Sequence, residues 1–186
     1  DLRTPLTSII GSADILLDRD GSLDVTESRR LLEGVRSDAA WLSETVENLL
    51  AITRLENGGM RLNTSLELMD DVIEEALRHV DRRVSEHSLV VEPSDGDCLV
   101  DVDARLMVQV IVNLVNNAVK YTPTGSHITI ALRRDGSWVK TSVSDDGPGI
   151  PPGDRDGVFD TFYTVGHGLA DGRRSFGLGL SLCKSI

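Results

Sequence analysis

The stretch V-N-L-V-N-N-A-V-K-Y-T, residues 112–122, decides the fold of the longer part of this 186-residue chain. Apolar residues occur nearly all round the helix that it predicts over residues 103–121, so this helix should be buried. Four polar residues at i, i+4, i+7 and i+8 nevertheless share one face: Asn113, Asn117, Lys120 and Tyr121. A buried amide without a partner costs about 1–3 kcal/mol. This face therefore either meets solvent or lines a ligand site, with amide oxygens for a hard cation, an ammonium for phosphate and a phenol ring beside a base.

The segments on either side of this helix mix helical and strand patterns. Short strands are predicted at 66–68, 89–92 and 98–100, helices at 70–80 and 177–186, and an antiparallel hairpin at 127–133 and 138–144. That order lacks the regular βαβ alternation of a doubly wound sheet, so we expect an α+β arrangement from residue 62 onward. Residues 151–176 are rich in glycine and lack periodicity, which is typical of a lid or binding loop.

Two glycine motifs flank that loop. In V-S-D-D-G-P-G-I, residues 143–150, Gly147 and Gly149 allow a ligand to approach the backbone where a β-carbon would block it. Asp145, at the end of a predicted strand, could accept a hydrogen bond from an exocyclic amine, although D-x-G-x-G is also an ordinary turn. In F-G-L-G-L, residues 176–180, Gly177 and Gly179 open a helix, a position that suits a phosphate but is weak evidence alone.

The first third of the chain predicts two helices, over residues 2–17 and 26–55. The second helix carries an apolar stripe with alternating steps of three and four, and Asn57-Gly58-Gly59 ends it. Two helices cannot enclose a core by themselves, so we expect this antiparallel hairpin to dimerise into a four-helix bundle. The alternative is that it packs on the rest of the chain.

Composition narrows the range of partners and locations. Lys+Arg 19 against Asp+Glu 30 gives a net charge of -11, which argues against general binding to nucleic acid or to an anionic membrane surface. The two cysteines have no paired spacing and are typical of thiols in a reducing compartment. No run approaches the roughly 20 apolar residues of a membrane span, so we expect this part of the protein to be cytoplasmic.

In order and spacing, the motifs resemble those of the histidine-kinase branch of the GHKL ATPases. The asparagine helix, D-D-G-P-G-I, V-F-D-T-F-Y (residues 158–163) and F-G-L-G-L resemble the N, G1, F and G2 boxes. D-L-R-T-P-L-T-S-I-I-G, residues 1–11, resembles the H-box, and R-L-E-N-G, residues 54–58, resembles the end of the second dimerisation helix. The last sixteen residues, D-G-R-R-S-F-G-L-G-L-S-L-C-K-S-I, resemble the osmosensitive potassium-channel (Kdp-type) sensor kinases.

The resemblance implies a division of the chain and a set of ligands. Residues 1–57 would form the dimerisation and histidine-phosphotransfer hairpin, and residues 62–186 a GHKL-type α/β sandwich that binds ATP and Mg²⁺, with an ATP lid at about 151–176. Asn117 would be the Mg²⁺ ligand, while Asn113 and Lys120 contact phosphate and Tyr121 lies against the adenine.

The resemblance also implies roles for residues of the glycine motifs, of residues 158–163 and of the H-box. Asp145 would accept from the adenine amino group, Gly147 and Gly149 would let the backbone approach the ring, and Gly177 and Gly179 would flank the phosphates. Phe159 and Phe162 would anchor the lid. Asp1 would act as general base for the phosphoacceptor histidine, and Thr4 would position water in the phosphatase reaction.

The resemblance also places the phosphoacceptor histidine immediately before Asp1 and the last strands of the ATP-binding domain after Ile186. We therefore expect the 186 residues alone not to phosphorylate themselves, and the four histidines present to be surface or satisfied residues. The implied function is a homodimeric sensor kinase that relays phosphate to a response-regulator aspartate in potassium or osmotic signalling, anchored in the membrane by other segments. The alternatives are a catalytically degenerate dimerisation scaffold and another GHKL ATPase that drives a clamp.

Overall fold

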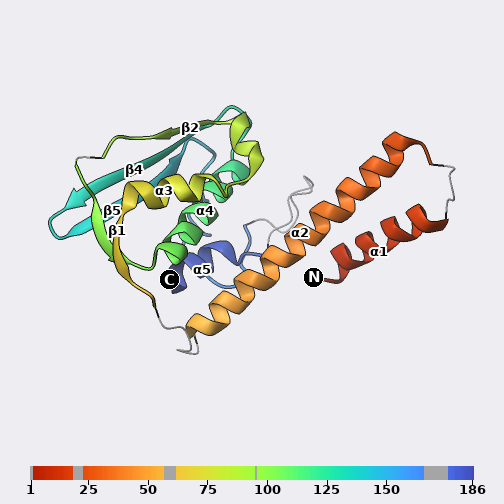
Figure 1. The fold of residues 1–186 in the computed structure, drawn as a ribbon, viewed down its shortest axis with the longest axis horizontal. Helices are drawn as coiled ribbons and strands as arrows, with labels where there is room; N and C mark the ends of the chain where they lie inside the picture. Colours follow the sequence, from red (N-terminus) through yellow and green to blue (C-terminus); the bar gives the residue numbers. More distant parts are fainter. Residues whose placement is uncertain (1, 19–22, 57–61, 95, 166–175) are drawn as a thin grey trace. The chain divides into compact units, whose positions relative to one another are not determined.

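The computed structural model describes residues 2–18, 23–56, 62–94, 96–165 and 176–186 (Figure 1). These form two compact units, residues 1–51 and 52–186, each of which is considered by itself. The boundary between the units falls inside the last turns of the second helix. Within the described ranges, none of the helices combines the length and the hydropathy that a membrane span requires.

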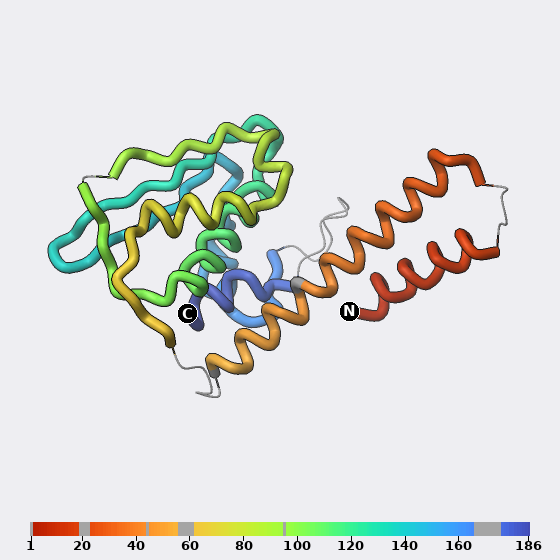
Figure 2. The backbone as a smooth tube through the Cα atoms, viewed as in Figure 1, coloured from red at the N-terminus to blue at the C-terminus, as the bar shows by residue number. Residues whose placement is uncertain are grey.

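The first unit contains two long helices, α1 (Arg3–Asp18) and most of α2 (Val25–Glu56), which run in opposite directions (Figure 2). Asp24 caps α2, because its Oδ1 accepts a 2.7 Å hydrogen bond from the backbone N–H of Glu27. One apolar stripe on each helix is half-buried at helical spacing: Ile9, Ala13 and Leu16 on α1, and Leu31, Val35 and Leu42 on α2. A second set of apolar side chains stays exposed: Leu6, Ile10, Leu17, Leu32, Val46 and Leu50.

The second unit contains two small sheets. The strands are β1 (Ser65–Leu68), β2 (Ser88–Val91), β3 (Leu99–Val102), β4 (His127–Asp135) and β5 (Trp138–Asp145). One sheet pairs β1 with β3 in antiparallel fashion, and the other has the order β2-β4-β5, with β2 parallel and β5 antiparallel to β4. Because Asp135 pairs with Trp138, the hairpin turns on two residues, and Gly136 adopts the positive φ of 61° that such a turn requires.

Three helices complete this unit: α3 (Met69–Leu77), α4 (Ala104–Tyr121) and α5 (Gly179–Ser185). The core lies between α3, α4 and the three-stranded sheet, and its most buried members are Ile73, Ala76, Ile111, Val115, Ile128 and Ile130. Asp103 begins α4 as its N-cap by accepting from the N–H of Leu106 at 3.3 Å, and its other carboxylate oxygen accepts from Asn63 at 3.1 Å. The expected helical hairpin followed by an α/β domain is confirmed.

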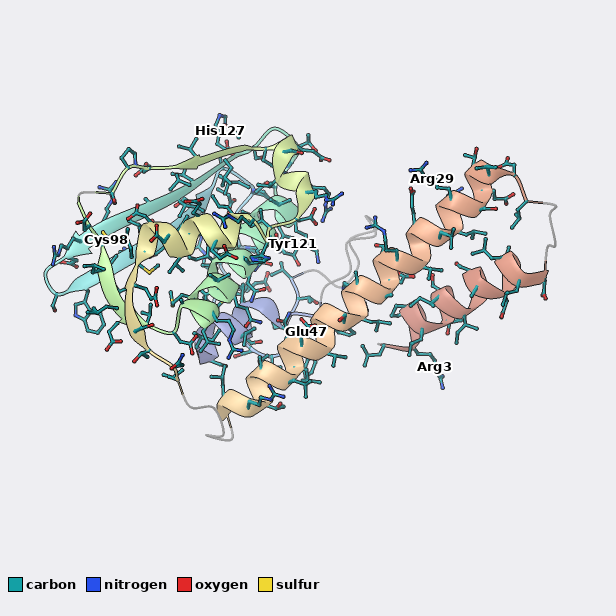
Figure 3. The ribbon with its side chains drawn as sticks, viewed as in Figure 1. Arg3, Arg29, Glu47, Cys98, Tyr121 and His127 are labelled. Carbon is teal, nitrogen blue, oxygen red and sulfur yellow. The ribbon has the colours of Figure 1, made fainter. Side chains whose placement is uncertain are left out.

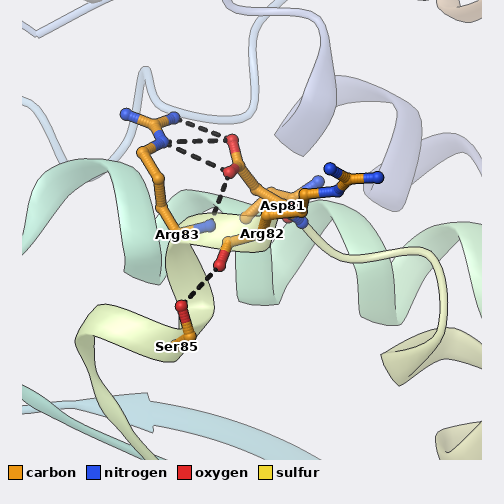
Figure 4. A network of polar contacts seen from close by, with 5 residues as sticks. Asp81, Arg82, Arg83 and Ser85 are labelled. Carbon is orange, nitrogen blue, oxygen red and sulfur yellow. Dashed lines mark hydrogen bonds and ion pairs between the residues drawn. The ribbon is translucent and has the colours of Figure 1, made fainter.

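Two predicted helix boundaries were wrong and one short 3₁₀ helix was not predicted, each for a local reason. The last helix begins at Gly179 and not at Gly177, since Gly177 has a left-handed φ of 66°. The predicted helix at 70–80 ends at Leu77, and a 3₁₀ helix, η1 (Arg82–Glu86), follows it. Asp81 starts this 3₁₀ helix by accepting from the N–H of Arg83 at 2.9 Å, and it also pairs with the Arg83 guanidinium at 2.8 Å (Figure 4).

Candidate functional site

Three asparagines of α4, namely Asn113, Asn116 and Asn117, have different surroundings. The Oδ1 atom of Asn116 accepts a 2.8 Å hydrogen bond from the N–H of Asp81, so Asn116 holds the turn before η1 against α4. Asn113 is only 8% exposed, and among the described residues its Nδ2 group is the one buried side-chain nitrogen or oxygen without a partner. The half-buried side chain of Asn117 makes no hydrogen bond to the described residues. Because an unpaired buried donor is costly, Asn113 indicates a site for an acceptor.

The start of α5 lies against Asn113. A β-carbon built on Gly179 would be 3.7 Å from Oδ1 of Asn113, which is ordinary van der Waals contact. One turn further along α5, Sγ of Cys183 lies 3.8 Å from the carbonyl oxygen of Val110. Burial raises the pKa of Cys183 to about 11. The structure therefore brings together Asn113 and Gly179, two of the predicted site residues.

The other end of α4 lies against the turn that follows β5. Asp145 is the last residue of β5, and its Oδ1 accepts a 3.0 Å hydrogen bond from the N–H of Gly147. A β-carbon on Gly147 would lie 2.6 Å from Cγ2 of Thr122 and 2.8 Å from Oδ1 of Asp145, so only glycine fits. Thr122 is itself fixed, because it is 3% exposed and its hydroxyl donates to the carbonyl oxygen of Ala118 at 2.8 Å. Gly149 has open space around it, and its φ of 69° is what requires glycine.

Lys120 and Tyr121 end α4 as a contacting pair. The ammonium nitrogen of Lys120 lies 5.4 Å from the centroid of the Tyr121 ring, within the range of a cation–π interaction. Tyr121 is 44% exposed, and Figure 3 shows its place on α4. A cation and an exposed aromatic ring therefore lie within a few residues of Thr122, which contacts Gly147.

The segments before and after residues 166–175 are joined by their backbones. Gly177 accepts a 3.2 Å hydrogen bond from the N–H of Phe162, and a β-carbon on Gly177 would overlap the carbonyl oxygen of Tyr163. The Tyr163 hydroxyl donates to the carboxylate of Asp154, a bond that raises the pKa of Tyr163.

The side chains of Phe159 and Phe162, which we expect to anchor the lid, are exposed. These side chains are 43% and 61% exposed, whereas Val158, at 7%, is buried. Phe162 contributes through its backbone, which reaches Gly177 because Phe162 itself adopts a φ of 68°. Val158 is therefore the buried apolar side chain of residues 158–163, and the anchoring role of Phe159 and Phe162 stays a prediction.

The two H-box residues belong to the first unit. Thr4 is exposed on α1, whereas Asp1 and residues 166–175 of the expected lid lie outside the described residues. Sequence reasoning missed Thr122, His127 and Asp146, which contact or adjoin the glycine turn. The signal for Thr122 was its place directly after the asparagine helix, and the signal for Asp146 was its neighbour Asp145.

The described residues contain no group of three histidine, cysteine, aspartate or glutamate side chains able to hold a metal ion. A divalent cation at α4 would instead take an amide oxygen together with oxygens from a ligand and water. Mg²⁺ prefers this arrangement, since it usually keeps several waters and binds substrate phosphates. The unpaired Nδ2 donor of Asn113 fits the phosphate of a ligand, and the glycine at position 147 fits a planar base close to the backbone.

Comparison with known proteins gives two family matches. The family described as "His Kinase A (phospho-acceptor) domain" matches residues 1–58, and "Histidine kinase-, DNA gyrase B-, and HSP90-like ATPase" matches residues 102–186. The sensor protein KdpD of Clostridium acetobutylicum is 35% identical over 186 residues, and that of Escherichia coli K12 is 32% identical. These matches cover all of this chain but only 21% and 20% of the relatives, so the chain spans about a fifth of their length.

Solved structures give the same result. The histidine kinase AdeS of Acinetobacter baumannii matches with a TM-score of 0.72 and 28% identity, over 99% of this chain and 83% of that one. The histidine kinase ThkA, in its complex with the response regulator protein TrrA, matches with a TM-score of 0.65 and 26% identity. That match covers 88% of this chain and 48% of the other.

Proposed function

Because this chain belongs to the sensor histidine kinases of the GHKL superfamily and is most like the Kdp type, we propose that its second unit binds Mg-ATP along α4. The observation that carries the proposal is that one helix contacts both glycine segments. Thr122 lies against Gly147, and Asn113 lies against Gly179. These contacts are nine residues apart, which is about 13 Å along a helix that rises 1.5 Å per residue. An extended nucleotide could therefore place its base at one contact and its phosphates at the other.

In this proposal, different residues contact the adenine, the phosphates and the Mg²⁺ ion. Asp145 uses Oδ1 for Gly147 and keeps its other oxygen to accept from the adenine amino group. Gly147 and Gly149 leave the backbone open to the ring, with Tyr121 beside it. Near the phosphates the site offers a set of donors and one metal ligand: Asn113, Lys120, Gly177 and Gly179, with the Asn117 oxygen for Mg²⁺.

Bound Mg-ATP supplies a transferable γ-phosphoryl group, and the protein contributes position and charge. The acceptor we propose is the imidazole of a histidine directly before Asp1, whose carboxylate takes the ring proton as general base. A response-regulator aspartate then receives the phosphoryl group, and Thr4 positions water when the kinase acts as a phosphatase. The ThkA–TrrA complex supports the regulator as partner, since a related kinase core binds a response regulator.

The wider setting follows from the relatives. The similarity to KdpD sensors supports a role in potassium or osmotic signalling, with these residues on the cytoplasmic side of a membrane-anchored protein. The match to the phospho-acceptor family over residues 1–58 and the exposed apolar side chains of α1 and α2 support a homodimer. The intact Asn117, Asp145 and glycine pairs argue against a degenerate scaffold, and the H-box argues against a clamp ATPase.

Binding of a non-hydrolysable ATP analogue with Mg²⁺, measured by titration calorimetry, tests this function. Asp145→Asn should weaken binding by about 1.5–3 kcal/mol, or more than about tenfold in Kd, because an amide nitrogen cannot accept from the adenine amine. Asp135→Asn, which changes an exposed carboxylate at the other end of the β4–β5 hairpin, is the matched control and should bind as wild type. Equal affinity for wild type and Asp145→Asn would remove Asp145 from the site.

A further inference from the structure

Asp146, the neighbour of Asp145, is tied to the first residue of β4 by three contacts. Its Oδ1 accepts from the backbone N–H of His127 at 2.8 Å, and its Oδ2 lies 3.0 Å from Nδ1 of the same residue. In return, the N–H of Asp146 donates to the carbonyl oxygen of His127 at 3.2 Å. The backbone N–H of His127 contributes most to keeping the pKa of Asp146 below its usual value, so Asp146 stays ionised.

These contacts hold the end of β5 on both sides of Asp145. The ladder between β4 and β5 pairs Asp145 with Ile128, and the Asp146–His127 contacts extend it by one residue. His127 is a firm anchor because it lies on the central strand, where it also pairs with Ser88 of β2. Immediately after Asp146, the N–H of Gly147 donates to the Asp145 carboxylate. The direction of the Asp145 carboxylate thus depends on Asp146, which is bonded to His127 and not to that carboxylate.

We propose that Asp146 is a positioning residue that determines purine specificity, by fixing the Asp145 carboxylate through its contacts with His127. The proposal rests on the proposed function. A 6-amino purine donates to a carboxylate, whereas a 6-oxo purine presents an oxygen that a carboxylate repels. Discrimination between ATP and ITP therefore requires that the carboxylate stay in the plane and at the position of that exocyclic group. Asp146 contributes this fixed position without contacting the nucleotide.

The test compares Mg-ATP with Mg-ITP affinity, by calorimetry, in wild type and five variants. Asp146→Ala should lower the preference for ATP about threefold to tenfold, the range expected when one or two hydrogen bonds are lost. Asp146→Asn should restore most of the preference, because its amide oxygen still accepts from the N–H of His127. Asp145→Asn should abolish the preference, since its NH₂ group can donate to the 6-oxo group. Asp135→Ala removes an exposed carboxylate from the far end of the same hairpin and should leave the ratio unchanged.

The ratio of the ATP affinity to the ITP affinity distinguishes a positioning role from a structural one. Loss of folded protein would weaken the binding of both nucleotides equally and leave this ratio unchanged. Asp146 is 53% exposed, so Asp146→Ala should fold, and Asp146→Ser gives a second variant too short to bridge both groups of His127. An unchanged ratio in Asp146→Ala and Asp146→Ser, alongside a collapsed ratio in Asp145→Asn, overturns this inference and leaves the proposed function intact. A wild-type chain that binds neither nucleotide overturns the proposed function, and this inference with it.

Discussion

Gly147 is the position in the proposed site where one added carbon atom should have the largest effect. Gly147→Ala would place its β-carbon on Thr122 and Asp145, which are both held by hydrogen bonds. Overpacking of this kind costs about 1–3 kcal/mol, so ATP affinity should fall about fivefold or more as the turn shifts. Gly34→Ala, which lies in the first unit and has nothing within 4 Å of the new carbon, is the control and should bind normally in the same calorimetric assay. Equal behaviour of the two variants would contradict the close contact at Gly147.

Asn117→Ala should act through the metal ion and not through packing. Its amide oxygen is the proposed ligand of Mg²⁺, so ATP affinity in Mg²⁺ should fall by about tenfold, as for one lost contact to a charged group. In EDTA the same variant should bind ATP nearly as wild type does. Asn116→Ala is the matched control from the adjacent position: it loses the bond to the N–H of Asp81, and its loss of affinity should be alike with and without Mg²⁺. An Mg²⁺-independent loss in Asn117→Ala would instead indicate damage to α4.

Residue-level roles could be predicted from the sequence only where spacing determines them. The i, i+4 periodicity placed Asn113 and Asn117 on one face, but it could not show that Asn116 bonds to Asp81 while Asn113 keeps an unpaired donor. That distinction depends on residues 35 positions away in sequence. Likewise, no local pattern links His127 with Asp146, because the register of β4 and β5 decides which residues meet.

At the scale of elements, α2 carries an apolar surface that its own unit leaves open. Leu32, Val46 and Leu50 are 56%, 47% and 48% exposed, and the first two are two heptads apart on one face. Burial of such side chains contributes about 1.5–3 kcal/mol each, which favours a second copy of the hairpin as the partner.

The double variant Leu32→Asp, Val46→Asp should therefore be a monomer in analytical sedimentation, because each substitution puts an unpaired carboxylate in the proposed seam. The folded state of one chain should survive, as both side chains are exposed in it. Arg30→Asp with Ser37→Asp places acids on another, exposed face of α2 and should remain dimeric. A wild-type chain that sediments as a monomer at high concentration would count against the four-helix bundle.

Element types could be predicted well because hydrophobic periodicity decides them, whereas their ends depend on single contacts. The strands of the β4–β5 hairpin and the helix α4 were anticipated from pattern alone. The late start of α5 follows from the left-handed Gly177, and η1 follows from the Asp81 side chain. Hydrophobic periodicity shows neither the backbone conformation of Gly177 nor the hydrogen bond of Asp81, so the start of α5 and the presence of η1 could not be predicted from it.

At the scale of the whole molecule, the two units carry different parts of one proposed reaction. The second unit holds the proposed nucleotide site, and the first carries Thr4 and the segment that resembles the H-box. The described histidines all belong to the second unit and have partners there: His79 lies 2.9 Å from Glu75, His127 lies 3.0 Å from Asp146, and His87 lies 3.5 Å from the Thr122 hydroxyl. None of these three offers the H-box pattern of an adjacent acid followed by a threonine one turn later. The acceptor should therefore be the residue before Asp1.

Mapping of the labelled site tests this central claim most directly. A longer form of the protein that includes the residues on both sides of this chain is incubated with Mg-ATP labelled at the γ-phosphate, and the modified residue is identified by mass spectrometry. We expect a single acid-labile, base-stable phosphate on a histidine immediately before Asp1, and slower labelling in Asp1→Asn with unchanged ATP affinity. Label on His79, His87, His127 or His167, or a residue other than histidine before Asp1, would contradict this claim.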